Sequence, residues 1–206
     1  MQIEQPIIFL DKDIHYICPH CEHIQYIEKN FTPTEYMDLP IYLDGFKKGM
    51  EEKYFQMKFI ICENCNSFTT QPEFIGINGN NPPSKIKKIL QSNIDILEKA
   101  FLSSYMLNPF LPQLIDLYWY YDIKANNTEK ASEYRKILIK KLGKDIKINN
   151  KNMIHKTMYV DVLRRNKEFK KALELATQYL KQSAYMDKPY FEKQIELCKE
   201  QNMNRY

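Results

Sequence analysis

Two pairs of cysteines, each with two residues between its members, constrain this chain more than any other feature of its sequence. The first pair is Cys18 and Cys21, and the second is Cys62 and Cys65. A CxxC turn directs both sulfurs at one ion, and two such turns complete a tetrahedron of thiolates around zinc. We therefore expect the four cysteines to hold one structural Zn²⁺, because four protein ligands leave no open position for a substrate.

The first cysteine pair also allows a second interpretation, a CxxC redox enzyme. The sequence Cys-Pro-His-Cys occurs at the active site of thioredoxin-fold oxidoreductases, where the first thiolate is activated. Those motifs follow a strand and open a helix, whereas the residues after Cys21 alternate as in a strand. His20 and His23 are further candidate ligands, but four cysteines already fill a tetrahedral site.

Short strands are predicted around both cysteine pairs. β-branched and aromatic residues flank the pairs at 14–17, 23–27, 55–61 and 67–70. Each pair is therefore expected at the tip of a β-hairpin, and the breaker-rich residues 31–54 are interpreted as an insertion carrying one short helix. Gly usually follows the second cysteine of such a turn. Here Glu22 and Asn66 stand there, and Asn tolerates a left-handed backbone better than Glu does.

The second half of the chain is predicted to be helical. A cluster of Gly, Asn and Pro at 76–83 precedes apolar residues at helical spacing, which predict one amphipathic helix over 84–106. Gly143 follows a basic turn, as at a helix end, and 188–202 form a closing helix.

A weak internal repeat also appears in this half. After a shift of 41 residues, 117–133 resemble 158–174, each copy being a helix, a polar turn and a helix with an Ala near its start. The segment 166–175 is similar to a tetratricopeptide repeat. The predicted fold class is therefore α+β, with a β-rich zinc ribbon over 1–80 and an all-α domain of tetratricopeptide-like hairpins over 84–206.

Charge divides the chain in the same way. Residues 1–82 hold 6 Lys and 12 Asp or Glu, a net charge of −6, and residues 83–206 carry +10, which together give the +4 of the whole chain. Basic helices can contact phosphates, although a solvated lysine-rich face is the plainer explanation. The candidate phosphate or nucleic-acid contacts are Arg135, Lys136, Lys140, Lys141, Arg164, Arg165, Lys170 and Lys171.

Binding is expected of this chain more than chemistry. The sequence has no HExxH motif, no phosphate-binding glycine loop and no GxSxG motif. Tyr118, Trp119 and Tyr121 are candidates for a partner groove, although residues of one helix point in several directions, so most are expected in the core. No stretch approaches the roughly 20 apolar residues that span a bilayer, so we expect a cytoplasmic protein without a membrane partner.

The order of these parts resembles an uncharacterised bacterial family in which a split CPxC…CxxC zinc ribbon precedes tetratricopeptide-like helices. The matching features are the two cysteine pairs and the hairpins from 113 to 182. A second bacterial family, found in prophage and defence settings, is similar in its proline-led boundary at Pro82 and Pro83 and in residues 135–138.

These observations give one leading expectation and two alternatives. The leading one is a non-enzymatic zinc-binding adaptor whose helical groove receives a protein or peptide partner. The first alternative is a nucleic-acid-binding protein that uses the basic helical face, and the second is the redox enzyme described above.

Overall fold

The computed structural model describes residues 7–10, 13–18, 20–27, 46, 55, 59–70, 83–149 and 151–206. The chain forms two compact units. Among the described residues, unit 1 holds everything up to Pro109 except Phe46, and unit 2 holds Phe46 and the residues from Phe110 on. The predicted insertion at 31–54 therefore lies, apart from Phe46, outside the described residues.

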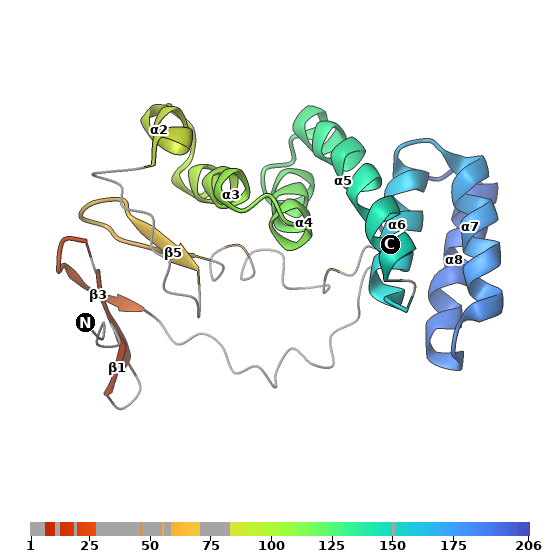
Figure 1. Ribbon diagram of the computed structural model, residues 1–206, viewed down its shortest axis with the longest axis horizontal. Coiled ribbons are helices and arrows are strands. Elements are labelled where there is room, and N and C mark those ends of the chain that lie inside the picture. The colour runs from red at the N-terminus through yellow and green to blue at the C-terminus, as the bar shows by residue number, and fades with distance from the viewer. Residues whose placement is uncertain are drawn as a thin grey trace. The chain divides into compact units, whose positions relative to one another are not determined.

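Unit 1 contains two β-hairpins that carry the cysteine pairs (Figure 1). Its strands are β1 (Ile7–Leu10), β2 (Asp13–Ile17), β3 (Ile24–Ile27), β4 (Phe59–Ile61) and β5 (Phe68–Thr70). The first three form an antiparallel sheet in chain order, and β4 pairs with β5. Ile17 pairs with Ile24, and Ile61 pairs with Phe68, so each cysteine pair closes a hairpin as predicted. The strand predicted over 55–61 is shorter in the structure. Phe55 has a helical backbone, and β4 begins at Phe59.

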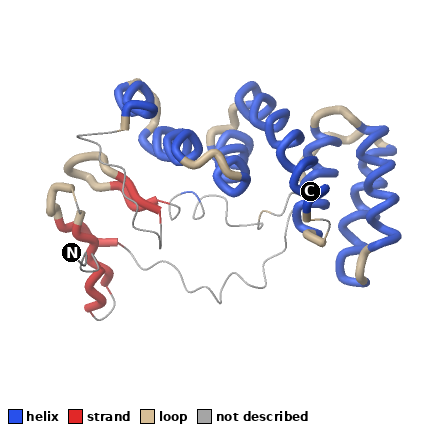
Figure 2. Tube along the Cα trace, viewed as in Figure 1, coloured by secondary structure: helices blue, strands red, loops and turns tan. Residues whose placement is uncertain are grey.

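Among its described residues, unit 1 also holds two helices after the hairpins (Figure 2). They are α2 (Ser84–Gln91) and α3 (Ile96–Leu107). The buried ring of Phe101 in α3 has its centroid 4.8 Å from that of Phe59 and 5.8 Å from that of Phe55. Because this aromatic core joins α3 to the second hairpin, the compact unit ends at Pro109, later than the boundary expected at residues 80–84.

The single helix predicted over 84–106 is wrong, because the chain breaks between α2 and α3. The Ser92 hydroxyl donates to the carbonyl of Ile89 at 2.5 Å, which ends α2. The Asp95 carboxylate accepts from the amides of Leu97 and Glu98 at 2.8 and 3.2 Å, which caps the start of α3. Side chains of this kind offer the backbone an alternative to a continuous helix, so the apolar spacing alone was misleading.

Unit 2 is all-α (Figures 1 and 2). Its elements are α4 (Leu111–Trp119), a π-helical turn (Tyr120–Lys124), α5 (Thr128–Ile148), α6 (Met153–Arg165), α7 (Phe169–Gln182), a 3₁₀ turn (Tyr185–Asp187) and α8 (Lys188–Lys199). Consecutive α-helices pack on one another, and α6 also packs on α8. The predicted closing helix is confirmed as α8, which is slightly shorter than expected.

The helix–turn–helix pattern of the internal repeat is confirmed. Its two turns contain Asn126 at φ 47° and Lys167 at φ 67°, two positions 41 residues apart. Ala131 and Ala172, also 41 residues apart, are both buried near the start of the second helix of each copy. Equivalent backbone turns and equivalent small buried residues therefore recur in the two copies.

The helix end predicted at Gly143 is wrong, because α5 continues to Ile148. A Cβ atom at position 143 would lie 3.1 Å from the hydroxyl oxygen of Tyr159 in α6, closer than ordinary van der Waals contact. Gly143 therefore allows α5 and α6 to approach closely and does not end the helix. Among the described residues, no helix combines the length and apolar composition needed to cross a membrane.

Candidate metal centre

The two cysteine turns have the same backbone hydrogen bonds. The amide of Cys18 donates to the carbonyl of His23 at 2.9 Å, and the amide of Glu22 donates to the carbonyl of Cys18 at 2.9 Å. The second turn repeats both bonds at the same spacings of five and four residues. The amide of Cys62 donates to the carbonyl of Ser67 at 2.8 Å, and the amide of Asn66 donates to the carbonyl of Cys62 at 2.9 Å. Each hairpin therefore presents its two sulfurs in the same way.

The four sulfurs meet at one point. All four Sγ atoms lie within 4.8 Å of one another. The Sγ atoms of Cys18 and Cys65 are 3.7 Å apart, and those of Cys21 and Cys62 are 3.6 Å apart. Both distances are far longer than a disulfide bond of about 2.0 Å. A tetrahedral ion with metal–sulfur bonds of about 2.3 Å would set neighbouring sulfurs about 3.8 Å apart. The four cysteines thus fit a single metal ion.

Gln25 joins the two hairpins beside the sulfurs. Its side-chain Nε2 donates to the carbonyl of Ile61 at 2.8 Å, and its Oε1 accepts from the amide of Glu63 at 3.1 Å. One amide side chain of β3 therefore satisfies a backbone acceptor and a backbone donor on either side of Cys62. Sequence reasoning missed this residue, because a Gln at an alternating strand position gives no signal of a partner 36 residues away.

Ser67 provides a further polar contact within the site. Its hydroxyl is fully buried and lies 3.0 Å from the Sγ atom of Cys65. When Cys65 is a thiolate, a hydroxyl at this distance is the donor of the hydrogen bond, which stabilises the charged sulfur. Outer hydrogen bonds of this kind orient metal ligands and tune their basicity.

Three of the four thiols have pKa values shifted from the ordinary value when no metal is bound. Burial raises the pKa of Cys18 to about 12, and burial also raises the pKa of Cys62. A hydrogen bond with the Asn64 side chain is the main cause that lowers the pKa of Cys21 to about 6. Redox CxxC motifs activate their first thiolate. Here the first cysteine of the CPHC sequence is the protonated one, which does not suit that chemistry.

Both turns require a left-handed backbone after their second cysteine. Glu22 has φ 58° and Asn66 has φ 54°. A side chain with a Cβ atom is strained in this region, and Asn is strained less than Glu. The first turn therefore keeps the usual geometry in spite of Glu22.

Replacing Glu22 by Gly is expected to stabilise unit 1 by about 1 kcal/mol, because Gly adopts positive φ without steric cost. Asn66→Gly is the matched comparison and is expected to give a smaller gain. Both variants are measured by the concentration of a competing chelator that removes half of the bound metal. A Glu22→Gly protein that loses its metal more readily than the parent would contradict the strain argument.

The candidate phosphate contacts do not form one exposed set. Arg164 is fully buried, and Arg165 and Arg135 have side chains that are only 10% and 13% exposed. These three residues serve the interior of unit 2, because each donates to an internal carboxylate. The remaining five candidates are exposed: Lys136, Lys140, Lys141, Lys170 and Lys171. The sequence therefore predicted eight basic contacts on the surface, of which five are exposed.

Arg164 is the centre of a buried polar network. Its Nη2 donates to Asp161 at 2.6 Å, its Nε donates to Gln194 of α8 at 2.9 Å, and its Nη1 donates to the carbonyl of Asn202. Gln194 also donates to Asp161 at 3.2 Å. The network joins α6 to α8 and to the segment after α8.

The candidate aromatic groove is also internal in large part. Tyr118 and Tyr121 are buried, and only Trp119 is partly exposed. Tyr118 accepts a hydrogen bond from Arg165 at 2.6 Å, and burial raises its pKa above the ordinary value. These two tyrosines therefore belong to the core, as the helical geometry of the run suggested. Cys198 is a buried free thiol of α8, as expected.

Comparison of the whole chain with known protein families, with curated proteins and with solved structures finds no match.

Proposed function

We propose that this chain is a non-enzymatic, zinc-binding interaction protein. Unit 1 is a zinc ribbon that the ion holds in shape, and the tetratricopeptide-like helices of unit 2 present a surface to a protein partner. The observation that carries the proposal is the convergence of four sulfurs from two equivalent, mutually hydrogen-bonded turns. Tetrahedral sets of four thiolates suit zinc, with iron–sulfur clusters as the rival.

A structural role follows from the ligand count. Four cysteine ligands complete a tetrahedral coordination sphere, so no position is left for a substrate or an activated water. Three of the four cysteines are also buried. The redox alternative needs a helix after the second cysteine and an activated first thiolate. The chain instead continues into β3, and burial raises the pKa of Cys18.

The partner surface that we propose is the apolar end of unit 2. This end comprises four exposed side chains at or beside the α5–α6 and α7–α8 connections: Ile148, Ile154, Tyr185 and Met186. Their exposed fractions run from 66% to 88%, which is high for large apolar residues. Exposed groups of this kind mark interaction sites when they cluster.

Side-chain contacts place both connections at the same end of the helices. Asp145 of α5 lies 2.6 Å from His155 of α6. The Lys156 ammonium group lies 4.9 Å from the ring centroid of Tyr179 in α7, and that ring contacts Phe191 of α8 at 5.8 Å. The end of α5, the start of α6, the end of α7 and the start of α8 are therefore adjacent, as Figure 1 also shows for these turns.

Charge indicates the chemistry of the partner. Exposed lysines surround the apolar end: Lys144, Lys147, Lys151, Lys181 and Lys188. Asp145 and Asp187 are the acidic residues of the same turns, and Asp145 is bonded to His155. An acidic protein segment with apolar side chains would complement this surface in both charge and hydrophobicity.

The test compares two variants with the parent in affinity purification from native cells, followed by binding measurements with the purified partner. Tyr185→Glu combined with Met186→Glu is expected to weaken binding about tenfold or more, because it places charge at the apolar end and repels an acidic partner. Phe110→Glu changes an equally apolar, 68% exposed residue elsewhere and should bind as the parent does. A partner that binds all three proteins equally would overturn the assignment of this surface.

A further inference from the structure

A pocket of unit 2 lies far along the chain from the metal ligands, and it has an unusual lining. Its volume is about 420 Å³, within the range of small-molecule sites. The first turns of α5, the α6–α7 turn and the segment after α8 form it. Among the described residues that line it, three are cationic and none is acidic; these residues are Thr128, Ser132, Arg135, Arg165, Asn166, Lys167, Met203 and Asn204.

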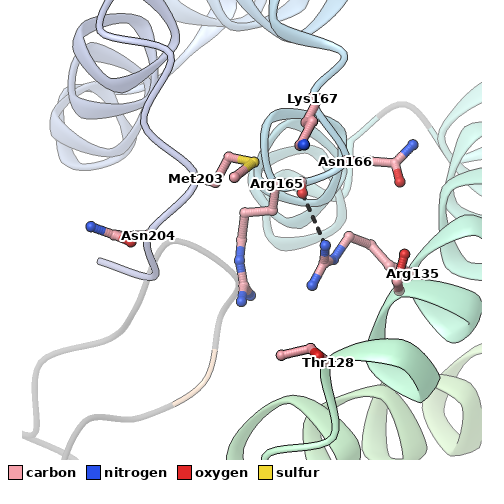
Figure 3. Close-up of a pocket in the computed structure, with 8 residues that line it drawn as sticks. Thr128, Arg135, Arg165, Asn166, Lys167, Met203 and Asn204 are labelled. Carbon is pink, nitrogen blue, oxygen red and sulfur yellow. Dashed lines mark hydrogen bonds between the residues drawn. The ribbon is translucent and has the colours of Figure 1, made fainter.

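Two arginines reach the pocket from different helices. Figure 3 shows Arg135 of α5 and Arg165 of α6 with their guanidinium groups ending close together, and Lys167 above them. Arg135 Nη1 donates to the carbonyl of Arg165 at 2.9 Å, which fixes its side chain. The site is therefore built by the fold and not by free surface side chains.

One carboxylate serves both arginines. Asp122 accepts from Arg165 at 2.7 and 2.8 Å and from Arg135 at 3.3 Å. A second carboxylate, Asp161, is bonded to the buried Arg164 at 2.6 Å and lies 3.9 Å from Arg165. Burial alone would lower the pKa of Arg165, but Tyr118, Asp161 and Asp122 outweigh burial and raise it, so the guanidinium stays charged.

The charges do not balance at this site. Asp161 offsets Arg164, and Asp122 offsets one of the two pocket arginines. Glu168 is paired with Lys171 at 3.5 Å, so it does not compensate the pocket either. Within the part of the chain that the structure describes, Arg135, Arg165 and Lys167 thus outnumber the remaining carboxylate by about two charges, which is close to the charge of a phosphate monoester at neutral pH, about −1.5 to −2.

Hydrogen-bond donors are also in excess. The Nε atoms of Arg135 and Arg165 are buried and have no acceptor within the described part of the chain. A buried donor without an acceptor destabilises the fold, because it has lost its hydrogen bonds to water. The Arg135 Nη groups make one described bond each, and a guanidinium has five N–H groups, so each Nη retains one N–H. Two arginines that line the pocket therefore carry N–H donors for which the described residues supply no acceptor.

Other donors line the same space. Thr128 is the first residue of α5, a 21-residue helix whose N-terminus favours negative charge. The hydroxyls of Thr128 and Ser132 and the amides of Asn166 and Asn204 can each donate to an oxygen. A small anion with several oxygens fits this lining better than a single carboxylate does.

We propose that this arginine pocket binds a phosphate group, either as the free ion or as the monoester of a small molecule. Arg135 and Arg165 supply paired N–H donors in fixed positions, and Lys167 supplies the third positive charge at the mouth. The proposal concerns unit 2 alone and is independent of the metal centre and of the apolar end.

Isothermal titration calorimetry of the full chain at low salt tests the proposal with three probes, which are inorganic phosphate, adenosine monophosphate and adenosine. Phosphate and the monophosphate are expected to bind and adenosine is not. Tighter binding of the monophosphate than of phosphate assigns the site to an organic phosphate, and equal affinities assign it to the free ion. Absence of binding by both phosphate probes would overturn the proposal, as would adenosine binding as tightly as the monophosphate.

Lys167→Gly separates loss of charge from loss of folding. Gly suits the positive φ of this position, so the variant keeps its fold, and phosphate affinity is expected to fall about fivefold. Arg135→Gln is expected to reduce affinity about tenfold or more. Gln201→Gly, at φ 51°, makes the same backbone change without loss of charge and should leave affinity unchanged. Unaltered affinity in both Lys167→Gly and Arg135→Gln would exclude this pocket as the site.

Discussion

The Cys62→Ser variant is expected to lose its metal ion and, with it, the folded structure of unit 1. A small metal-bound unit has little core of its own, so the free energy of metal binding is also free energy of folding, about 10–16 kcal/mol for structural zinc. Net stabilities of proteins are only about 5–15 kcal/mol. Loss of one of four ligands is therefore expected to reduce the free energy of metal binding by more than the net stability of unit 1. Metal content and limited proteolysis mapped by mass spectrometry measure the effect, with new cleavages expected within residues 7–70.

Cys198→Ser is the matched control for this experiment. It makes the same chemical change at a buried cysteine of α8, outside the cluster of four sulfurs. We expect it to cost about 1 kcal/mol and to keep its metal ion. A Cys62→Ser protein that retained one ion per chain and the proteolytic pattern of the parent would show that the site does not hold unit 1 together.

Replacing Arg164 by Met is expected to destabilise unit 2 by about 3–5 kcal/mol. The substitution keeps an unbranched apolar stem but removes the cation that pairs with the buried Asp161 at 2.6 Å, which leaves this carboxylate only the longer 3.9 Å contact with Arg165. It also removes the hydrogen bonds to Gln194 and to the carbonyl of Asn202, which join α6 to α8 and the C-terminal segment. Trp119, the single Trp of the chain, lies in unit 2, so its fluorescence during denaturant unfolding reports on this unit.

An exposed ion pair of the same length provides the control. Lys193 and Glu196 are 2.6 Å apart, as are Arg164 and Asp161, and both pairs are three residues apart in a helix. Because the Lys193 and Glu196 side chains are 38% and 52% exposed, Lys193→Met should change the free energy of unfolding far less than Arg164→Met does. Equal losses in the two variants would show that burial is not what makes the Arg164 network important.

The convergence of the four cysteines on one point could be predicted from sequence, because it depends on local spacing. Two residues between cysteines suffice to place both sulfurs on one turn, and alternating apolar residues indicated the strands of both hairpins. Gln25 could not be found in this way. Its role depends on the approach of Ile61 and Glu63 on the other hairpin, which no local pattern encodes.

The helical part was predicted correctly in kind and incorrectly in several details. Periodicity located the helices but not the break between α2 and α3, because the polar capping groups of Ser92 and Asp95 act against continued apolar spacing. Gly143 resembled a helix end in the sequence. In the structure it lies inside α5, where the lack of a Cβ atom leaves room for the Tyr159 side chain. Local signals of this kind have two structural explanations, and only tertiary packing decides between them.

Charge was the least reliable guide. Arg135, Arg164 and Arg165 counted as surface groups in the sequence, although their acidic partners lie on α6 and in the turn after α4. Arg164 and Asp161 are one helical turn apart, which is a recognisable pairing, but the same spacing also occurs in the exposed pair of Lys193 and Glu196. Burial distinguishes the two pairs, and burial follows from the packing of α8 on α6.

Native mass spectrometry of the purified chain, combined with elemental analysis, tests the central claim most directly. The arrangement of Cys18, Cys21, Cys62 and Cys65 predicts one zinc ion per chain, released when the thiolates are protonated in acid. A protein that carries no metal, that carries an iron–sulfur cluster, or that contains disulfides among these four cysteines would contradict it.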